Sequence, residues 1–88
     1  MELNSEVIKI FIEGWLVKQD CFCLVDRQVK RGDVVFDLTD NILVLKNIES
    51  KKQYIAITIP YDLQPSDCIA FAMKSYCEIS QVIEKEKF

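Results

Sequence analysis

The 88-residue sequence contains no histidine, and it has only two glycines, two prolines and one tryptophan. Without histidine, the chain lacks the side chain that most often serves as a general base, as the partner of a catalytic serine or cysteine, and as a metal ligand. No other catalytic motif takes its place, since there is no glycine-rich phosphate loop, nucleophile elbow or paired-carboxylate signature. We therefore expect a protein that is not an enzyme and that needs no cofactor.

Long apolar runs are also missing. A membrane-spanning helix requires roughly 18 apolar residues, and the most apolar N-terminal stretch, residues 7–17, is interrupted by Lys9 and Glu13. Glu2 and Glu6 stand where a secretory signal peptide would carry positive charge. These features predict a cytoplasmic protein without a membrane span.

The overall composition is that of a globular protein. Hydrophobic residues make up 50% of the chain and charged residues 28%, and the formal net charge is −3. An acidic chain is a poor candidate for indiscriminate nucleic-acid binding, so we do not expect a nucleic acid as partner. The length predicts a single domain over residues 1–88.

Four cysteines raise the question of disulfides or a metal site. Cys21 and Cys23 lie two apart in a predicted strand and share a face, whereas Cys68 and Cys77 lie on opposite sides of a predicted helix. Neither pair can easily bridge to itself, which favours reduced thiols that serve as small apolar residues. A zinc site made of four thiolates is the alternative, but the Cys-x-Cys spacing does not match the usual one. We therefore expect no metal.

The first part of the chain, residues 1–60, has the pattern of a β-sheet, because Ile, Val, Phe and Tyr are abundant and polar clusters recur at short intervals. The alternating patterns predict five strands, over residues 7–17, 21–29, 34–39, 42–48 and 53–59. Gly14 predicts a bulge or bend in the first strand, and Gly32 a turn with positive φ. Pro60 ends the last strand.

After Pro65 the apolar period changes to that of a helix. Ser66 or Asp67 can cap its N-terminus, and apolar residues then recur at steps of three and four: Ile69, Ala72, Met73, Tyr76, Ile79, Val82 and Ile83. The prediction is an α+β fold, with a five-stranded antiparallel meander, as a curled sheet or partial barrel, and one amphipathic helix over residues 66–86.

One helix covers only one face of a sheet. The other face is predicted to carry large side chains, including Phe11, Trp15, Phe22 and Leu24, so that either the sheet closes or this face meets a partner. We therefore predict a small protein-binding regulator or inhibitor that acts through the uncovered sheet face or an edge strand. A homodimer, formed by pairing of the predicted strand 7–17 with its symmetry mate, is left open.

Basic residues offer a second interpretation. Arg27, Lys30 and Arg31 form one group and Lys51 and Lys52 another, each at a predicted hairpin tip. If the tips are neighbours, they form a basic patch suited to phosphate groups of a lipid head group or RNA, or to an acidic partner surface. The simpler interpretation is that turns carry solvated charge.

Two short stretches, Gly14-Trp15-Leu16 and Leu38-Thr39-Asp40-Asn41, resemble the first and third strands of pleckstrin-homology domains. The resemblance implies a curled antiparallel sheet with a C-terminal helix, and a phosphoinositide ligand. The chain departs from that family in having room for fewer strands, and in having Gly32 and Asp33 where basic or aromatic residues are expected.

Residues 7–16, with the sequence VIKIFIEGWL, resemble the start of the small T-even phage antitoxins that block the host RNase LS toxin. This resemblance implies a host-directed inhibitor that works by protein contact.

Overall fold

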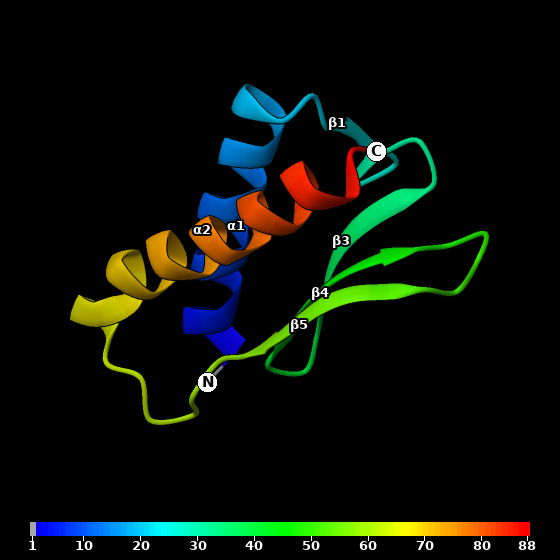
Figure 1. Cartoon of the computed structure of the whole chain (residues 1–88). Coiled ribbons are helices and arrows are strands. Elements are labelled where there is room, and N and C mark those ends of the chain that lie inside the picture. Colours follow the sequence, from blue (N-terminus) through cyan, green and yellow to red (C-terminus); the bar gives the residue numbers. More distant parts are fainter. Residues whose placement is uncertain (1) are drawn as a thin grey trace.

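The computed structural model describes residues 2–88, and their side chains from Asn4 onward. Within these residues the elements in chain order are α1 (Glu2–Gln19), β1 (Cys23–Val25), β2 (Gln28–Arg31), β3 (Val34–Thr39), β4 (Ile42–Asn47), β5 (Gln53–Thr58), the 3-10 helix η1 (Pro65–Asp67) and α2 (Cys68–Glu86). Figure 1 shows the two long helices lying beside one sheet. Among the described residues, no helix is long and apolar enough to cross a membrane.

The sheet is an antiparallel meander whose strands lie in sequence order, from β1 at one edge to β5 at the other. It is curled but not closed, because β1 and β5 do not pair. The predicted α+β fold, with five antiparallel strands and a C-terminal helix, is confirmed.

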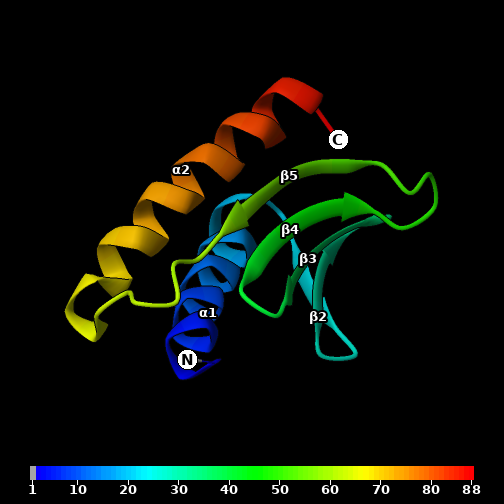
Figure 2. The ribbon, with the colours of Figure 1, turned by 90° about the horizontal axis from the view of Figure 1, so that it is seen from below.

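The core lies between the sheet and the two helices, which both cover the same face (Figure 2). Phe36 pairs with Leu45 across β3 and β4, and Leu45 pairs with Ile55 of β5, so these residues share that face. On the opposite face, Val35 is fully buried although it lies outside the main core, and Lys30 and Lys46 are its cross-strand neighbours.

The predicted strand over residues 7–17 is wrong, because this stretch lies inside helix α1. Ile8, Ile12 and Leu16 are fully buried, at the four-residue spacing of one helix face, whereas Ile10 is 63% exposed. Residues spaced by four also fall on one face of a strand, so both patterns fit Ile8, Ile12 and Leu16. Only Ile10 separates them. Gly14 therefore lies within a helix and not at a β-bulge.

The predicted strand over residues 21–29 is divided in the structure. β1 and β2 form a hairpin joined by Asp26 and Arg27, both with positive φ, at 51° and 65°. Positive φ at both central residues is the geometry of a type I′ turn, which suits the twist of a two-residue hairpin. Residues 7–17 form a helix in place of one predicted strand, and this hairpin supplies two strands where one was predicted, so the sheet still has five strands. The positive φ predicted for Gly32 is confirmed, at 62°.

Helix α2 follows the prediction closely, since η1 and α2 together cover Pro65–Asp67 and Cys68–Glu86. Its buried face consists of Cys68, Ala72, Ser75, Ile79 and Ile83. The helix ends at Lys87, which has the left-handed conformation common at helix C-termini.

Candidate functional site

The three aromatic residues predicted to share an uncovered sheet face do not share one. Phe22 is 2% exposed and belongs to the core. Phe11 and Trp15 lie on helix α1, four residues apart and one turn from each other. The physical reason is the helical conformation of residues 7–17, which turns Trp15 toward Tyr76 of α2 and places Phe11 beside Trp15, one turn earlier on α1.

Phe11 and Trp15 begin an aromatic row that continues onto α2. The rings of Phe11 and Trp15 are stacked, with centroids 5.9 Å apart and planes inclined by 28°. The indole of Trp15 contacts the ring of Tyr76, with centroids 5.4 Å apart and planes tilted by 51°. The four-residue spacing of Phe11 and Trp15 is a helical signal, but nothing in the sequence indicates Tyr76 as the third member.

A pocket of about 230 Å³ lies against this row and is lined by Trp15, Gln19, Met73, Tyr76 and Cys77. None of these five lining side chains is charged. Tyr76 and the side chains from α2 form one wall, and Trp15 and Gln19 of α1 form the other, so the pocket depends on how the two helices pack together.

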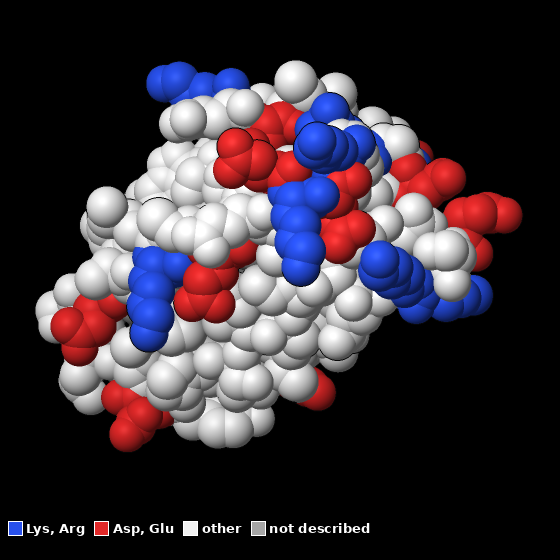
Figure 3. All heavy atoms as spheres, viewed as in Figure 1, with Lys and Arg blue, Asp and Glu red and all other residues white. Residues whose placement is uncertain are grey.

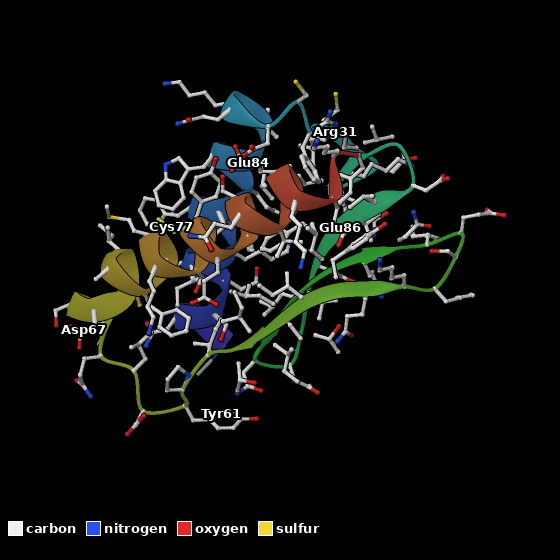
Figure 4. The ribbon with its side chains drawn as sticks, viewed as in Figure 1. Arg31, Tyr61, Asp67, Cys77, Glu84 and Glu86 are labelled. Atoms are coloured by element: carbon white, nitrogen blue, oxygen red, sulfur yellow. The ribbon has the colours of Figure 1, made fainter. Side chains whose placement is uncertain are left out.

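Exposed apolar side chains of α2 extend the pocket outward. Ile69 is 53% exposed and Met73 54% exposed, and exposed Cys77 follows at the same four-residue spacing. Figure 4 places Cys77 midway along α2, away from the strands. We call Phe11, Trp15, Ile69, Met73 and Cys77 together the helical apolar surface. Such a surface in water is unfavourable unless something covers it, because burying apolar area is the main driving force of association.

One polar contact fixes the geometry of this surface. The phenol of Tyr76 donates a hydrogen bond to Oδ2 of Asp20, at 2.5 Å. Burial of the phenol, together with its hydrogen bond to the Asp20 carboxylate and the negative charge of that carboxylate, raises the pKa of Tyr76 to about 12. Tyr76 is therefore a neutral donor at physiological pH and holds α2 against the end of α1.

The sheet topology separates one of the predicted basic residues, Arg27, from Lys51 and Lys52. Because consecutive strands are antiparallel, Arg27 in the β1–β2 turn lies at the opposite end of the sheet from Lys51 and Lys52 in the β4–β5 turn. Lys30 and Arg31 are the last two residues of β2. The β2–β3 turn that follows them lies at the same end of the sheet as the β4–β5 turn, where the amide of Ile48 donates to the carbonyl of Asp33 at 2.8 Å.

Several of these bases also have partners within the chain. Arg31 donates a hydrogen bond to the backbone carbonyl of Asp20, at 3.2 Å. Lys52 lies 3.5 Å from the carboxylate of Glu86, and its ammonium lies 5.1 Å from the ring centroid of Tyr54. Figure 3 shows acidic and basic side chains intermixed over the end of the molecule where α2 finishes.

A second pocket, of about 300 Å³, lies between the start of α1 and the end of β5, and is lined by Asn4, Ser5, Asp40, Asn41, Ile59, Pro60 and Tyr61. The side-chain amide of Asn41 donates to the carbonyl of Ile59 at 2.7 Å, and the backbone carbonyl of Asn41 accepts from the amide of Ile59 at 2.7 Å. Asn41 thus ties the end of β5 to the β3–β4 turn, which is a role in the fold.

The four cysteines are free thiols. Cys21, Cys23 and Cys77 are exposed, whereas Cys68 is buried, so the prediction that Cys68 and Cys77 lie on different sides of the helix is confirmed. Within residues 2–88, no three potential ligands among cysteine, aspartate and glutamate converge to hold a metal ion.

Comparison with protein families, with characterised proteins and with solved structures finds no match for this chain. The resemblances to pleckstrin-homology domains and to phage antitoxins therefore stay predictions.

Proposed function

We propose that this protein is a small non-enzymatic binding module that recognises another protein through the helical apolar surface. The observation that carries the proposal is the exposure of Ile69 and Met73, at 53% and 54%, beside a pocket walled by the only tryptophan of the chain. Tryptophan and tyrosine are the residues most often found at the energetic centre of protein interfaces. The absence of histidine from the sequence supports the non-enzymatic part of the proposal.

The size of the pocket favours a protein partner over a free small molecule. Small-molecule sites usually enclose about 300–1,000 Å³, and this pocket of about 230 Å³ is smaller. Its lining is uncharged and mostly apolar, with the amide of Gln19 as a polar group at one side. These properties suit one aliphatic or aromatic side chain of a partner, with Ile69 and Phe11 covered by the residues on either side of it.

The proposal keeps Phe11 and Trp15 as partner-binding residues, but they lie on helix α1 and not on an uncovered sheet face. The sequence does not predict Met73, Ile69 and Cys77 as binding residues, because the helical pattern of α2 places Ile69 and Met73 with its buried residues. A lone helix over the sheet would bury them, whereas here α1 shares the sheet face and α2 is rotated onto α1.

Less supports the alternative of a phosphate-ligand module. A phosphate site needs several bases that converge. The sheet topology separates Arg27 from Lys51 and Lys52, and Arg31, which ends β2 at their end of the sheet, donates to the carbonyl of Asp20. Glu86 also partly neutralises Lys52.

The proposal is tested with three forms of the full chain: wild type, Met73→Glu and Leu24→Glu. Leu24 is a matched control because it is an apolar residue with 66% exposure on β1, an element that contributes no residue to the helical apolar surface. Each form is immobilised and used to capture proteins from a cell extract. We expect a protein that is bound by wild type and by Leu24→Glu and is lost with Met73→Glu.

The contact itself is read from the indole N–H signal of Trp15 in an NMR spectrum of the isotope-labelled chain. This signal is unique because the chain has one tryptophan, and it should shift when the captured protein is added unlabelled. A captured protein that survives Met73→Glu but is lost with Leu24→Glu would assign binding to the β1 edge and contradict the proposal.

A further inference from the structure

A second apolar row of α1 lies on the side opposite Ile8, Ile12 and Leu16, and only its first residue, Val7, packs partly against the core. It consists of Val7, Ile10, Gly14 and Val17, which we call the α1 seam. Ile10 is 63% exposed, Val17 44% exposed and Gly14 exposed, while Val7 is partly buried at its start. Because Ile8, Ile12 and Leu16 are buried on the opposite side, α1 is apolar on both faces, which is typical of a helix with protein on both sides.

The spacing of the seam is that of a helix–helix contact. Its residues follow one another at steps of three, four and three, which are the a and d positions of two successive heptads. Outside its own helix, nothing lies within 4 Å of the place where a Cβ of Gly14 would be, so the middle of the seam is open and allows another backbone to approach closely.

In Figure 2, α1 is seen obliquely, with the sheet on one side and α2 on another. Among residues 2–88, no other element of the chain covers the remaining side. The seam is therefore available to a second molecule.

The charges beside the seam indicate which molecule fits it. Glu6 and Glu13 follow one flank, at heptad positions g, and Phe11 and Lys18 follow the other, at positions e. In a parallel pair of such helices, a g residue meets the e residue five positions later in the other helix. Glu13 of one copy then meets Lys18 of the second copy, twice by symmetry. In an antiparallel pair, the g positions face each other and would bring glutamates together.

We propose that α1 pairs in parallel with α1 of a second copy of this chain, through Val7, Ile10, Gly14 and Val17, with Glu13 of each copy facing Lys18 of the other. Glu13 already lies 3.0 Å from Lys9 in its own helix, so in the dimer its carboxylate bridges two ammonium groups. The proposal goes beyond the binding function above, because the seam and the helical apolar surface are different faces that meet only near Phe11.

The test is the mass of the full chain in solution, measured by sedimentation equilibrium over a range of concentrations with reductant present. We expect a concentration-dependent dimer. Ile10→Glu should weaken it at least about tenfold, because a charge replaces an exposed apolar side chain in both copies. Lys18→Glu should weaken it about three- to tenfold, because two attractive pairs become repulsive.

Two controls keep the result specific. The double variant Glu13→Lys with Lys18→Glu restores the pairing and should recover most of the wild-type affinity, while Met73→Glu, on the other surface, should leave the dimer unchanged. Far-UV circular dichroism verifies that each variant keeps its helices. The proposed parallel pairing would be overturned if the chain stayed monomeric. It would also be overturned if the dimer affinity were unchanged by Ile10→Glu or by Lys18→Glu.

Discussion

The phenol of Tyr76 lies 2.5 Å from Oδ2 of Asp20, and this hydrogen bond joins α2 to the residue that follows α1, 56 positions earlier in the sequence. Asp20 follows the last turn of α1 and also offers its backbone carbonyl to Arg31 of β2. A single residue thus connects α1, α2 and the sheet beside the helical apolar surface.

Loss of this hydrogen bond should destabilise the protein. Tyr76→Phe removes the hydroxyl but keeps the ring that contacts Trp15, so we expect a loss of about 1–2 kcal/mol, typical of a hydrogen bond to a charged group that remains partly solvated. Urea unfolding of wild type, Tyr76→Phe, Asp20→Asn and the double variant measures the coupling. If the effects of the two single variants simply add, the residues do not act as a pair.

The raised pKa of Tyr76 predicts a loss of stability at high pH. A group whose pKa is higher in the folded state than the ordinary value of 10.0 stabilises the fold fully below that value, and this contribution disappears as pH rises toward about 12. Wild type should therefore lose more of its free energy of unfolding between pH 10 and 12 than Tyr76→Phe does. The comparison with Tyr76→Phe removes the contribution of every other group, because the two proteins differ only in this hydroxyl. Parallel pH profiles of the two proteins would contradict the prediction.

The helical conformation of α1 makes a simple prediction about two isoleucines. Ile12→Ala should cost about 2–5 kcal/mol, as is usual for a fully buried side chain, because Ile12 is 0% exposed. Ile10→Ala should change the free energy of unfolding by no more than about 0.5 kcal/mol, because Ile10 is 63% exposed. Thermal or urea unfolding at a concentration where the chain is monomeric gives both values. Equal losses would favour the strand predicted from the alternating pattern.

These two isoleucines also explain where prediction from the sequence fails. The strands β3, β4 and β5 are predicted nearly to the residue, because their runs are rich in β-branched side chains and are bounded by turn residues. In residues 7–17 the β-branched composition favours a strand, and only the exposed position of Ile10 in the structure distinguishes the helix from that strand. Packing of α1 against β3 and α2 therefore outweighs local propensity.

The site is predicted only in part for a related reason. The sequence indicates Phe11 and Trp15, because large apolar side chains without an evident place in the core are noticeable in a sequence. Tyr76 and Met73 belong to the same region, but the helical pattern assigns both to the buried face of α2. Which residues of α2 are exposed depends on the angle between α2 and α1. The sequence pattern of α2 alone does not determine that angle.

The two glycines should respond in opposite ways to alanine. Gly14 lies in the exposed interior of α1, and outside that helix nothing lies within 4 Å of the position that an added Cβ would take, so Gly14→Ala should stabilise the monomer by about 0.5–1 kcal/mol. Gly32 has a φ of +62° in the β2–β3 turn, so Gly32→Ala should destabilise the protein by about 1 kcal/mol. Urea unfolding of both variants at low concentration measures the difference. A destabilised Gly14→Ala would mean that residue 14 is not in a helix.

The thiols provide a final prediction, which tests the packing of α2 directly. Cys21, Cys23 and Cys77 are exposed, whereas Cys68 is 4% exposed beneath the first turn of α2, where its Sγ lies 3.8 Å from the carbonyl of Gln64. Titration of the native protein with a thiol reagent such as dithionitrobenzoate should therefore give three rapid reactions and one slow one, because attack requires access to the thiolate. In denaturant all four should react rapidly. Cys68→Ser should abolish the slow phase alone, and Cys77→Ser should remove one rapid reaction. A native protein in which all four thiols react at similar rates would show that the N-terminal turn of α2 opens readily, and the wall that Met73 contributes to the pocket would then not be a fixed part of the surface.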